Sequence, residues 1–113
     1  MPGRAPSKRG AGLQFGPDVT QAFLKRNKLE LIVRSHEVKA QGYEVAHGGK
    51  LITVFSAPNY CDQMGNLGAF IRFEDARCQP KFRTFSHVPH PQIGPMAYAS
   101  RFSSMFGGFG ISF

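Results

Sequence analysis

The stretch from Val33 to Asn66 reads VRSHEVKAQGYEVAHGGKLITVFSAPNYCDQMGN. Two apolar-rich runs, EVAH and KLITVF, flank the pair Gly48-Gly49, and glycine accepts the positive φ angles that a tight turn needs. These runs therefore predict an antiparallel β-hairpin. Just before them, LELIV (29–33) is short and almost continuously apolar, which is typical of a strand covered on both faces. Polar residues 34–36 follow at the carboxyl end of that strand, the edge at which open sheets usually bind ligands.

A helix is predicted upstream of this strand, in GPDVTQAFLKRNK (16–28). Pro17 suits the first helical position and Asp18 the positive end of the helix dipole, while basic residues gather at the negative end. The apolar residues that share one face of this helix are Val19, Ala22 and Phe23. Residues 1–15 are rich in Gly, Arg, Pro and Ser without periodicity, and we expect a loop or a ragged start there.

A second hairpin is predicted downstream, from GAFIRFE (68–74) and KFRTFSH (81–87). A long loop, SAPNYCDQMGNLG, connects the two hairpins. A short helix is compatible with residues 96–105, and residues 101–113 form a tail rich in Phe, Gly and Ser. The order of helix, buried strand, two hairpins and tail indicates a mixed α/β structure, with too few helices to cover both faces of its sheets.

The length and the charge of the chain narrow its class. Its 113 residues suit one domain, and 14 Lys and Arg against 7 Asp and Glu give a net charge of +7, which favours an anionic partner such as a phosphorylated protein or nucleic acid. Cys61 and Cys78 are the two cysteines, and the first residues lack the apolar core of a signal peptide. We therefore expect a reducing, cytoplasmic or nuclear location. No membrane contact is expected, because no apolar run approaches about 18 residues.

Five side chains suggest chemistry, and each has a structural alternative. His36 lies where an imidazole could ligate a metal, although a lone histidine there is more often a hydrogen-bonded structural residue. Arg9 and Arg34 are candidate phosphate clamps, because a guanidinium matches two phosphate oxygens, but most arginines in so basic a chain are solvated. Tyr60 either faces a cleft or packs within its loop. Cys61 has no adjacent base, so a catalytic thiolate is not expected there.

Two other kinds of site find weaker support. The spacings of His36, His47 and Cys61 match no compact zinc pattern. The runs FIRF and KFRTF interleave aromatic and basic residues, as a platform for single-stranded RNA does, but a half-buried hairpin shows the same alternation. Nucleic acid is therefore the less favoured partner.

Longer motifs carry a resemblance to a known family. RSHE (34–37), GYE (42–44) and VFSAPNYCDQMGN (54–66) resemble the C-terminal part of metallophosphatases of the phosphoprotein phosphatase family. The motifs SKRG, FGPDVT, VPHP and PMAYA occur in the same order, so the resemblance covers roughly residues 7 to 100. It implies an α/β fold in which residues 16–100 are the C-terminal fragment of a calcineurin-like metallophosphatase β-sandwich flanked by helices.

The resemblance also implies an activity. In this family two divalent metal ions, manganese or iron with zinc, activate a water molecule that hydrolyses phosphoserine and phosphothreonine in proteins. Matched position by position, His36 is a metal ligand, Arg9 binds the substrate phosphate, and Tyr60 and Cys61 line the substrate groove. The His47-Gly48-Gly49 triplet is not assigned to metal, because the family's HGG motif lies upstream of the part that this sequence resembles.

Other motifs of the family are absent from the 113 residues, namely GDxHG, GDxVDRG and GNHE. With one ligand retained, we expect no two-metal site and no hydrolysis by this chain alone. The chaperone-binding repeats of one relative are absent as well. A start immediately before SKRG would cut a compact domain through its middle, so we expect a larger parent enzyme. The alternative is a non-catalytic chain that binds phosphoproteins or phosphatase partners.

Overall fold

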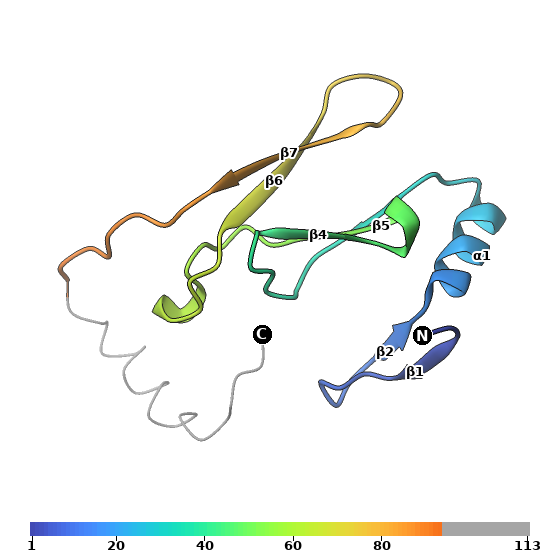
Figure 1. The fold of residues 1–113 in the computed structure, drawn as a ribbon, viewed down its shortest axis with the longest axis horizontal. Coiled ribbons are helices and arrows are strands. Elements are labelled where there is room, and N and C mark those ends of the chain that lie inside the picture. The colour runs from blue at the N-terminus through green and yellow to red at the C-terminus, as the bar shows by residue number, and fades with distance from the viewer. Residues whose placement is uncertain (94–113) are drawn as a thin grey trace.

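A computed structural model of the protein describes residues 1–93 (Figure 1). The predictions for the tail, including the helix at 96–105 and the segment 101–113, lie outside these residues. The described part is a mixed α/β structure, as predicted, with little helix. Its elements are β1 (Arg4–Pro6), β2 (Leu13–Phe15), α1 (Pro17–Asn27), β3 (Ile32–Arg34), β4 (Tyr43–Ala46), the 3-10 turn η1 (His47–Gly49), β5 (Leu51–Val54), the 3-10 turn η2 (Tyr60–Asp62), β6 (Gly68–Phe73) and β7 (Pro80–Phe85).

The strands form three small sheets (Figure 1). The central sheet has the order β3-β5-β4, in which β3 runs parallel and β4 antiparallel to β5. The other two sheets are the antiparallel pairs β1-β2 and β6-β7. Both predicted hairpins, β4-β5 and β6-β7, are therefore confirmed. In the turn between β4 and β5, Gly48 and Gly49 have φ angles of 65° and 88°, which is the left-handed conformation that the glycine pair predicted.

The helix α1 begins at Pro17, as predicted, and ends in a left-handed cap at Lys28 with φ 55°. Its buried face differs from the predicted one. Thr20 and Leu24 are buried, whereas Phe23 is 49% exposed. The reason is a polar contact, because Thr20 Oγ1 and His47 Nδ1 are hydrogen-bonded at 2.8 Å and hold this side of the helix against the turn η1.

The first strand of the central sheet also differs from the prediction. It was expected at 29–33 with both faces covered, but β3 starts at Ile32, and Val33 is 43% exposed. The backbone of Leu29 donates to the carbonyl of Leu24 at 2.9 Å, so this residue belongs to the end of the helix. Among the strands of residues 1–93, β3 is an edge strand with a neighbour only on its β5 side, so the apolar run is left partly exposed.

Residues 1–15 are not a plain loop, because β1 and β2 form a short hairpin. Ser7 N donates to Gly12 O at 3.2 Å, and Gln14 Nε2 donates to Pro6 O at 3.1 Å. Gly10 and Gly12 take positive φ angles of 81° and 77° in the turn. Strands of three residues are too short to show an alternating pattern, which is why the sequence did not predict them.

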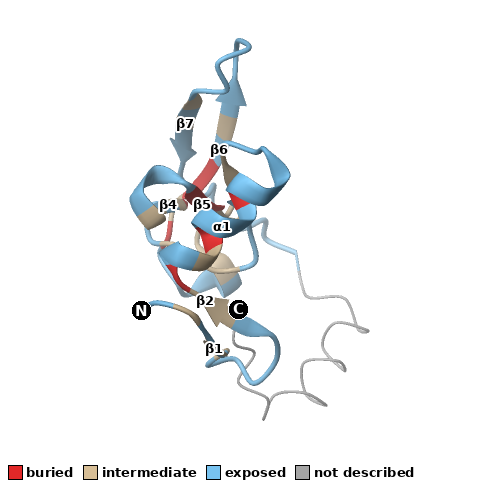
Figure 2. Ribbon diagram, turned by 90° about the vertical axis from the view of Figure 1, so that its right-hand side faces the viewer, coloured by how far each residue is buried: buried red, intermediate tan, exposed pale blue. Residues whose placement is uncertain are grey.

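The apolar core is small (Figure 2). Within residues 1–93 the buried apolar side chains are Leu24, Leu51, Ile52 and Ala69. The radius of gyration of the Cα atoms is 17.5 Å, whereas a compact domain of about 100 residues has about 13 Å. Large apolar side chains such as Phe23, Val45 and Phe73 are about half exposed. In the described part of the chain, α1 alone leaves much of the sheets uncovered, as the sequence led us to expect. No helix in this part of the chain has both the length and the hydropathy needed to cross a bilayer.

The central sheet and the hairpin β6-β7 meet at Gly42. Phe55 N donates to Gly42 O at 2.8 Å, and Ala69 N donates to Phe55 O at 3.0 Å, so the backbones at the ends of β5 and β6 are tied together. The rings of Tyr43 and Phe82 stack with their centroids 4.0 Å apart and add a side-chain contact at the same junction. Gly42 is buried and has a φ of 81°.

Candidate functional site

Two of the predicted site residues are neighbours at the carboxyl end of β3. His36 lies two residues after the end of β3, is exposed, and has a φ of 86°. Arg9 lies in the turn between β1 and β2, and its Nη1 donates to the carbonyl oxygen of His36 at 3.1 Å. The hairpin that the sequence did not predict therefore carries the candidate phosphate clamp to the candidate metal ligand.

The other candidate clamp, Arg34, is held in ion-pair and hydrogen-bond contacts. Its Nη1 donates to Thr53 Oγ1 at 3.0 Å and lies 3.5 Å from Glu37 Oε2. Lys39 Nζ lies 3.3 Å from the same Glu37 oxygen and 3.2 Å from Glu44 Oε1. Arg34 thus ties β3 to β5 through charged and polar contacts, and Arg9 is the more available of the two arginines.

The charge around Glu37 favours its ionised form. Burial alone would raise the pKa of the Glu37 carboxyl, but nearby cations outweigh burial and lower the pKa below its ordinary value of 4.5. These cations are Arg34, Lys39 and Arg9. A carboxylate with a lowered pKa in the folded state stabilises the fold above its unfolded pKa, and this contribution is lost as the pH falls through the folded pKa.

We expect Glu37→Gln to remove this part of the pH dependence of stability. Because the Glu37 side chain is 41% exposed, solvent screening keeps the effect near neutral pH below about 1 kcal/mol. Urea unfolding of both proteins at about pH 7 and about pH 4 measures it, and the difference between them should shrink at the lower pH. A difference that stays constant with pH would contradict the assignment.

A shallow groove of about 550 Å³ lies where the central sheet ends, and it brings His36 and Tyr60 together. The side chains come from the segments that follow β3 and β5, whose carboxyl ends meet because the two strands are parallel. The ring of Tyr60 packs edge-on against Phe55 with the centroids 5.0 Å apart. The groove is lined by Ser35, His36, Val54, Phe55, Ser56, Ala57 and Tyr60.

The loop that carries Tyr60 has an unusual backbone. Asn59, Cys61 and Asp62 have φ angles of 46°, 58° and 57°, a left-handed conformation that side-chain-bearing residues rarely adopt. Cys61 is exposed and is not among the residues that line the groove. The loop closes on Asn66, which is 4% exposed and which the sequence analysis did not single out.

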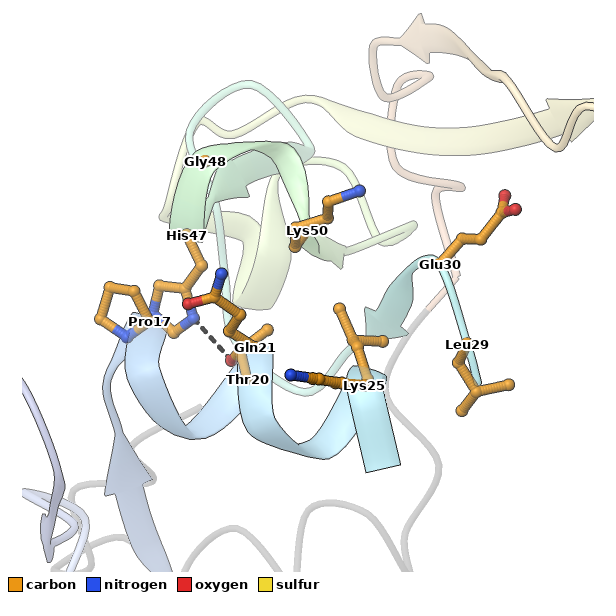
Figure 3. A pocket seen from close by; sticks show the side chains of 10 residues that line it. Pro17, Thr20, Gln21, Lys25, Leu29, Glu30, His47, Gly48 and Lys50 are labelled. Atoms are coloured by element: carbon orange, nitrogen blue, oxygen red, sulfur yellow. Dashed lines mark hydrogen bonds between the residues drawn. The ribbon is translucent and has the colours of Figure 1, made fainter. Parts of the chain in front are cut away.

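A second pocket, of about 550 Å³, lies between α1 and the turn of the β4-β5 hairpin (Figure 3). The hydrogen bond between Thr20 and His47 forms part of its wall, and Figure 3 draws it as a dashed line. The ring of Phe15 meets the imidazole of His47 edge-on at 5.9 Å. These contacts hold the His47 imidazole against Thr20 of α1 and Phe15 of β2.

The residues present do not make a complete metal site. Within residues 1–93, no group of three or more His, Cys, Asp or Glu side chains is placed to hold a metal ion. His36 can offer one imidazole, whereas a two-metal site needs several shared ligands. The described residues on their own therefore do not fit the two metal ions that the family resemblance implies.

Comparisons with known proteins identify the family. No protein-family model matches the chain. The chain is 69% identical over 106 residues to serine/threonine-protein phosphatase 5 of Arabidopsis thaliana, covering 94% of this chain and 20% of that protein. It is 69% identical over 103 residues to serine/threonine-protein phosphatase T of Trypanosoma brucei brucei, covering 90% of this chain and 22% of that protein. The human serine/threonine-protein phosphatase 5 is 62% identical over 98 residues, covering 87% of this chain and 20% of that protein.

A solved structure agrees with these relatives. It is a protein serine/threonine phosphatase from Saccharomyces cerevisiae with similarity to human phosphatase PP5, and it matches with a TM-score of 0.75 at 45% identity. The match covers 87% of this chain and 34% of the yeast chain. The predicted resemblance is thus confirmed, and the chain spans about a fifth of the length of the curated relatives that it matches. The chain belongs to the family of serine/threonine-protein phosphatases 5 and T and matches about a fifth of their length.

Proposed function

We propose that this chain forms one wall of the active site of a metal-dependent protein serine/threonine phosphatase. The observation that carries the proposal is the contact of Arg9 with His36, together with the groove that His36 shares with Tyr60. These residues come from three separate segments, and the fold brings them to the same end of the central sheet. The relatives are named serine/threonine-protein phosphatases, which supports phosphoserine and phosphothreonine proteins as the substrates of the whole enzyme.

Each residue has a role in the proposal. Arg9 binds the substrate phosphate, since one Nη1 donor reaches the backbone of His36 and a guanidinium has further donors for phosphate oxygens. Tyr60 lines the side of the groove on which the substrate peptide lies, and Cys61 follows it on the same loop, outside the groove lining. His36 is one metal ligand of the complete enzyme, whose ions are manganese or iron with zinc. The remaining ligands come from outside the described residues.

The proposal includes two further statements about the chain. The 113 residues alone do not hydrolyse phosphate esters, because the described residues 1–93 contain no group of three or more side chains placed to hold a metal ion. The enzyme works in the cytoplasm or the nucleus, which two exposed and unpaired thiols, Cys61 and Cys78, support.

The first test uses a longer protein that contains this chain together with the motifs GDxHG, GDxVDRG and GNHE. We expect His36→Ala to lower phosphopeptide turnover and bound metal by about 100-fold or more, because even an outer-shell partner of a metal ligand contributes 10- to 100-fold. Turnover and the metal content of the dialysed protein are the measurements. His87→Ala, in the exposed Pro-rich segment, is the control. A His36→Ala enzyme that stays active and metal-replete would refute the role of His36.

A second candidate function is binding of phosphoproteins without hydrolysis by the chain itself. The net charge of +7 and the exposed Arg9 beside the groove favour it. It predicts that the 113-residue chain binds a phosphoserine peptide in preference to the unphosphorylated peptide and leaves the phosphate in place.

In that binding assay we expect Arg9→Ala to weaken the phosphopeptide affinity by about 10- to 100-fold, since a charge-assisted hydrogen bond contributes about 1.5–3 kcal/mol. Arg83→Ala is the matched control, because Arg83 is an exposed arginine on β7. Fluorescence anisotropy with a labelled peptide measures both. Equal losses in the two variants would show a general effect of charge, and tighter binding of single-stranded RNA than of the phosphopeptide would favour the nucleic-acid alternative.

A further inference from the structure

Asn66 is a buried polar residue at the base of the loop that carries Tyr60 and Cys61. Its side-chain Oδ1 accepts a hydrogen bond from Tyr60 N at 2.8 Å. Its Nδ2 donates to the carbonyl oxygens of Ala57 and Leu67, both at 3.0 Å. The amide group therefore uses its acceptor and both of its donors on backbone groups, and only 4% of the residue is exposed.

The backbone of Asn66 closes the loop a second time. Its carbonyl oxygen accepts from Asn59 N at 2.8 Å, and Asn59 Oδ1 in turn accepts from Gly65 N at 3.0 Å. Together these bonds join both ends of the segment 57–67 around a single side chain. The segment is thus held by one residue in its interior.

The hydrogen bonds of Asn66 stabilise a loop whose backbone conformation is unfavourable. Left-handed residues with side chains are costly and persist only where the surrounding structure determines them. Asn59, Cys61 and Asp62 all take that conformation, and Tyr60 lies among them. The hydrogen bond from Tyr60 N to Asn66 falls in the middle of this strained run.

We propose that Asn66 is a positioning residue, which holds the backbone of Tyr60 and Cys61 so that Tyr60 faces the groove it shares with His36. The inference rests on the proposed function only in taking the groove to be the place where the substrate peptide binds. No smaller or differently charged residue offers the same bonds. Alanine lacks them all, and aspartate keeps the acceptor for Tyr60 N but faces two carbonyl oxygens without a donor.

This difference makes aspartate a useful probe. A buried carboxylate against two carbonyl oxygens is disfavoured, so the pKa of the introduced acid is raised. When protonated, the acid donates to one carbonyl and still accepts from Tyr60 N. The other titratable groups at this loop are Tyr60, Cys61 and Asp62, together with His90, whose Nε2 lies 3.6 Å from Asp62 Oδ2, and His36 across the groove. The unmodified chain carries the same groups and serves as the reference at every pH.

The experiment compares the full 113-residue chain with Asn66→Ala and Asn66→Asp. The first readout is amide hydrogen exchange at Tyr60, measured by NMR against Ile52 in β5. The second is the rate of alkylation of Cys61 relative to Cys78, both of which are exposed, read by mass spectrometry. Each is measured at about pH 8 and about pH 5, on either side of a raised aspartate pKa.

We expect Asn66→Ala to speed exchange at Tyr60 by about tenfold at both pH values, since a lost hydrogen bond of about 1.4 kcal/mol gives that factor. The ratio of Cys61 to Cys78 alkylation should change with it. Asn66→Asp should also speed exchange at the higher pH, because the carbonyl oxygens of Ala57 and Leu67 repel the carboxylate and displace it from Tyr60 N, and it should recover most of the unmodified rates at the lower pH. If Asn66→Asp only disturbed the packing of the loop, protonation of the introduced acid would not restore the exchange and alkylation rates.

Two results would overturn the inference. In the first, Asn66→Ala leaves both the amide exchange rate at Tyr60 and the relative alkylation rate of Cys61 unchanged, while Ile52 stays protected. The other is an Asn66→Asp variant that shows no recovery at the lower pH. If Ile52 also loses protection in Asn66→Ala, the aspartate variant at the lower pH decides, because recovery there restores both the loop and the sheet.

Phosphopeptide binding separates this inference from the proposed function. If the unmodified chain binds no phosphoserine peptide but the loop responds to Asn66 as described, the proposed use of the groove fails and the positioning role stands. If the unmodified chain binds the peptide and Asn66→Ala binds it equally well with an unchanged loop, the positioning role fails and the proposed function stands.

Discussion

Replacing Gly42 by alanine is expected to lower the free energy of unfolding by about 4 kcal/mol. A Cβ atom built on Gly42 would lie 2.6 Å from the carbonyl carbon of Gly68 and 2.8 Å from Ala69 N. Both are backbone atoms at the start of β6, and they cannot rotate away as a side chain can. The φ of 81° adds strain of its own. The substitution therefore separates the hairpin β6-β7 from the central sheet.

The matched control for this variant is Gly48→Ala. Gly48 also has a left-handed φ, of 65°, but no heavy atom lies within 4 Å of the position of its Cβ. Its expected cost is about 1–2 kcal/mol, from the backbone conformation alone. Urea denaturation followed by circular dichroism compares both with the unmodified chain. Equal costs for the two variants would show that the close approach at Gly42 does not contribute.

Replacing Ile52 by alanine is expected to lower the free energy of unfolding by about 3 kcal/mol, through lost burial and the cavity left behind. Ile52 is 1% exposed and lies on β5, the strand that has a neighbour on each side. Few other apolar side chains are buried in the described part of the chain, so little remains to fill the space. Thermal and urea unfolding both measure the loss.

Val45→Ala is the control for Ile52. Val45 is the cross-strand partner of Ile52 on β4 but is 47% exposed, and its truncation should cost less than about 1 kcal/mol. A similar loss in both variants would mean that burial on β5 is not what stabilises the sheet. It would point instead to strand propensity, which both substitutions reduce.

The sequence predicted the elements that have strong local signals. Pro17 and Asp18 marked the start of α1, because a proline fits only the first turn of a helix and a carboxylate favours its positive end. The pair Gly48-Gly49 marked the turn of the β4-β5 hairpin, because few other residues accept positive φ at successive positions. These signals act within a few residues, so they can be recognised without the rest of the fold.

Features that depend on distant partners were not predicted. The helix buries Thr20 because a hydroxyl meets His47, and the hydropathy of the helix contains no sign of this hydrogen bond. The turn that carries Arg9 belongs to strands of three residues, whose alternation is too short to detect. Asn66 looked like an ordinary loop residue, since asparagine after glycine is common in turns. Its burial follows only when the loop has closed around it.

In the candidate site, too, the sequence identified individual residues but not which of them lie close together. The resemblance selected Arg9, His36, Tyr60 and Cys61, and their roles remain predictions. The structure adds that His36 and Tyr60 share a groove and that Arg9 touches His36. These proximities follow from the parallel pairing of β3 with β5 and from the hairpin β1-β2. Neither pairing could be read from composition or periodicity.

The parallel pairing of β3 with β5 also has a consequence for the kinetics of folding. Ile32 pairs with Leu51 across a connection that contains the whole of β4, whereas the hairpin β4-β5 closes over a short turn. Short loops close first, because the entropy lost on closure grows with loop length. We therefore expect β4 and β5 to pair within about 1–10 μs, as isolated hairpins do. The strand β3 should dock in a later and slower phase, and the neighbourhood of His36 should form in that last step.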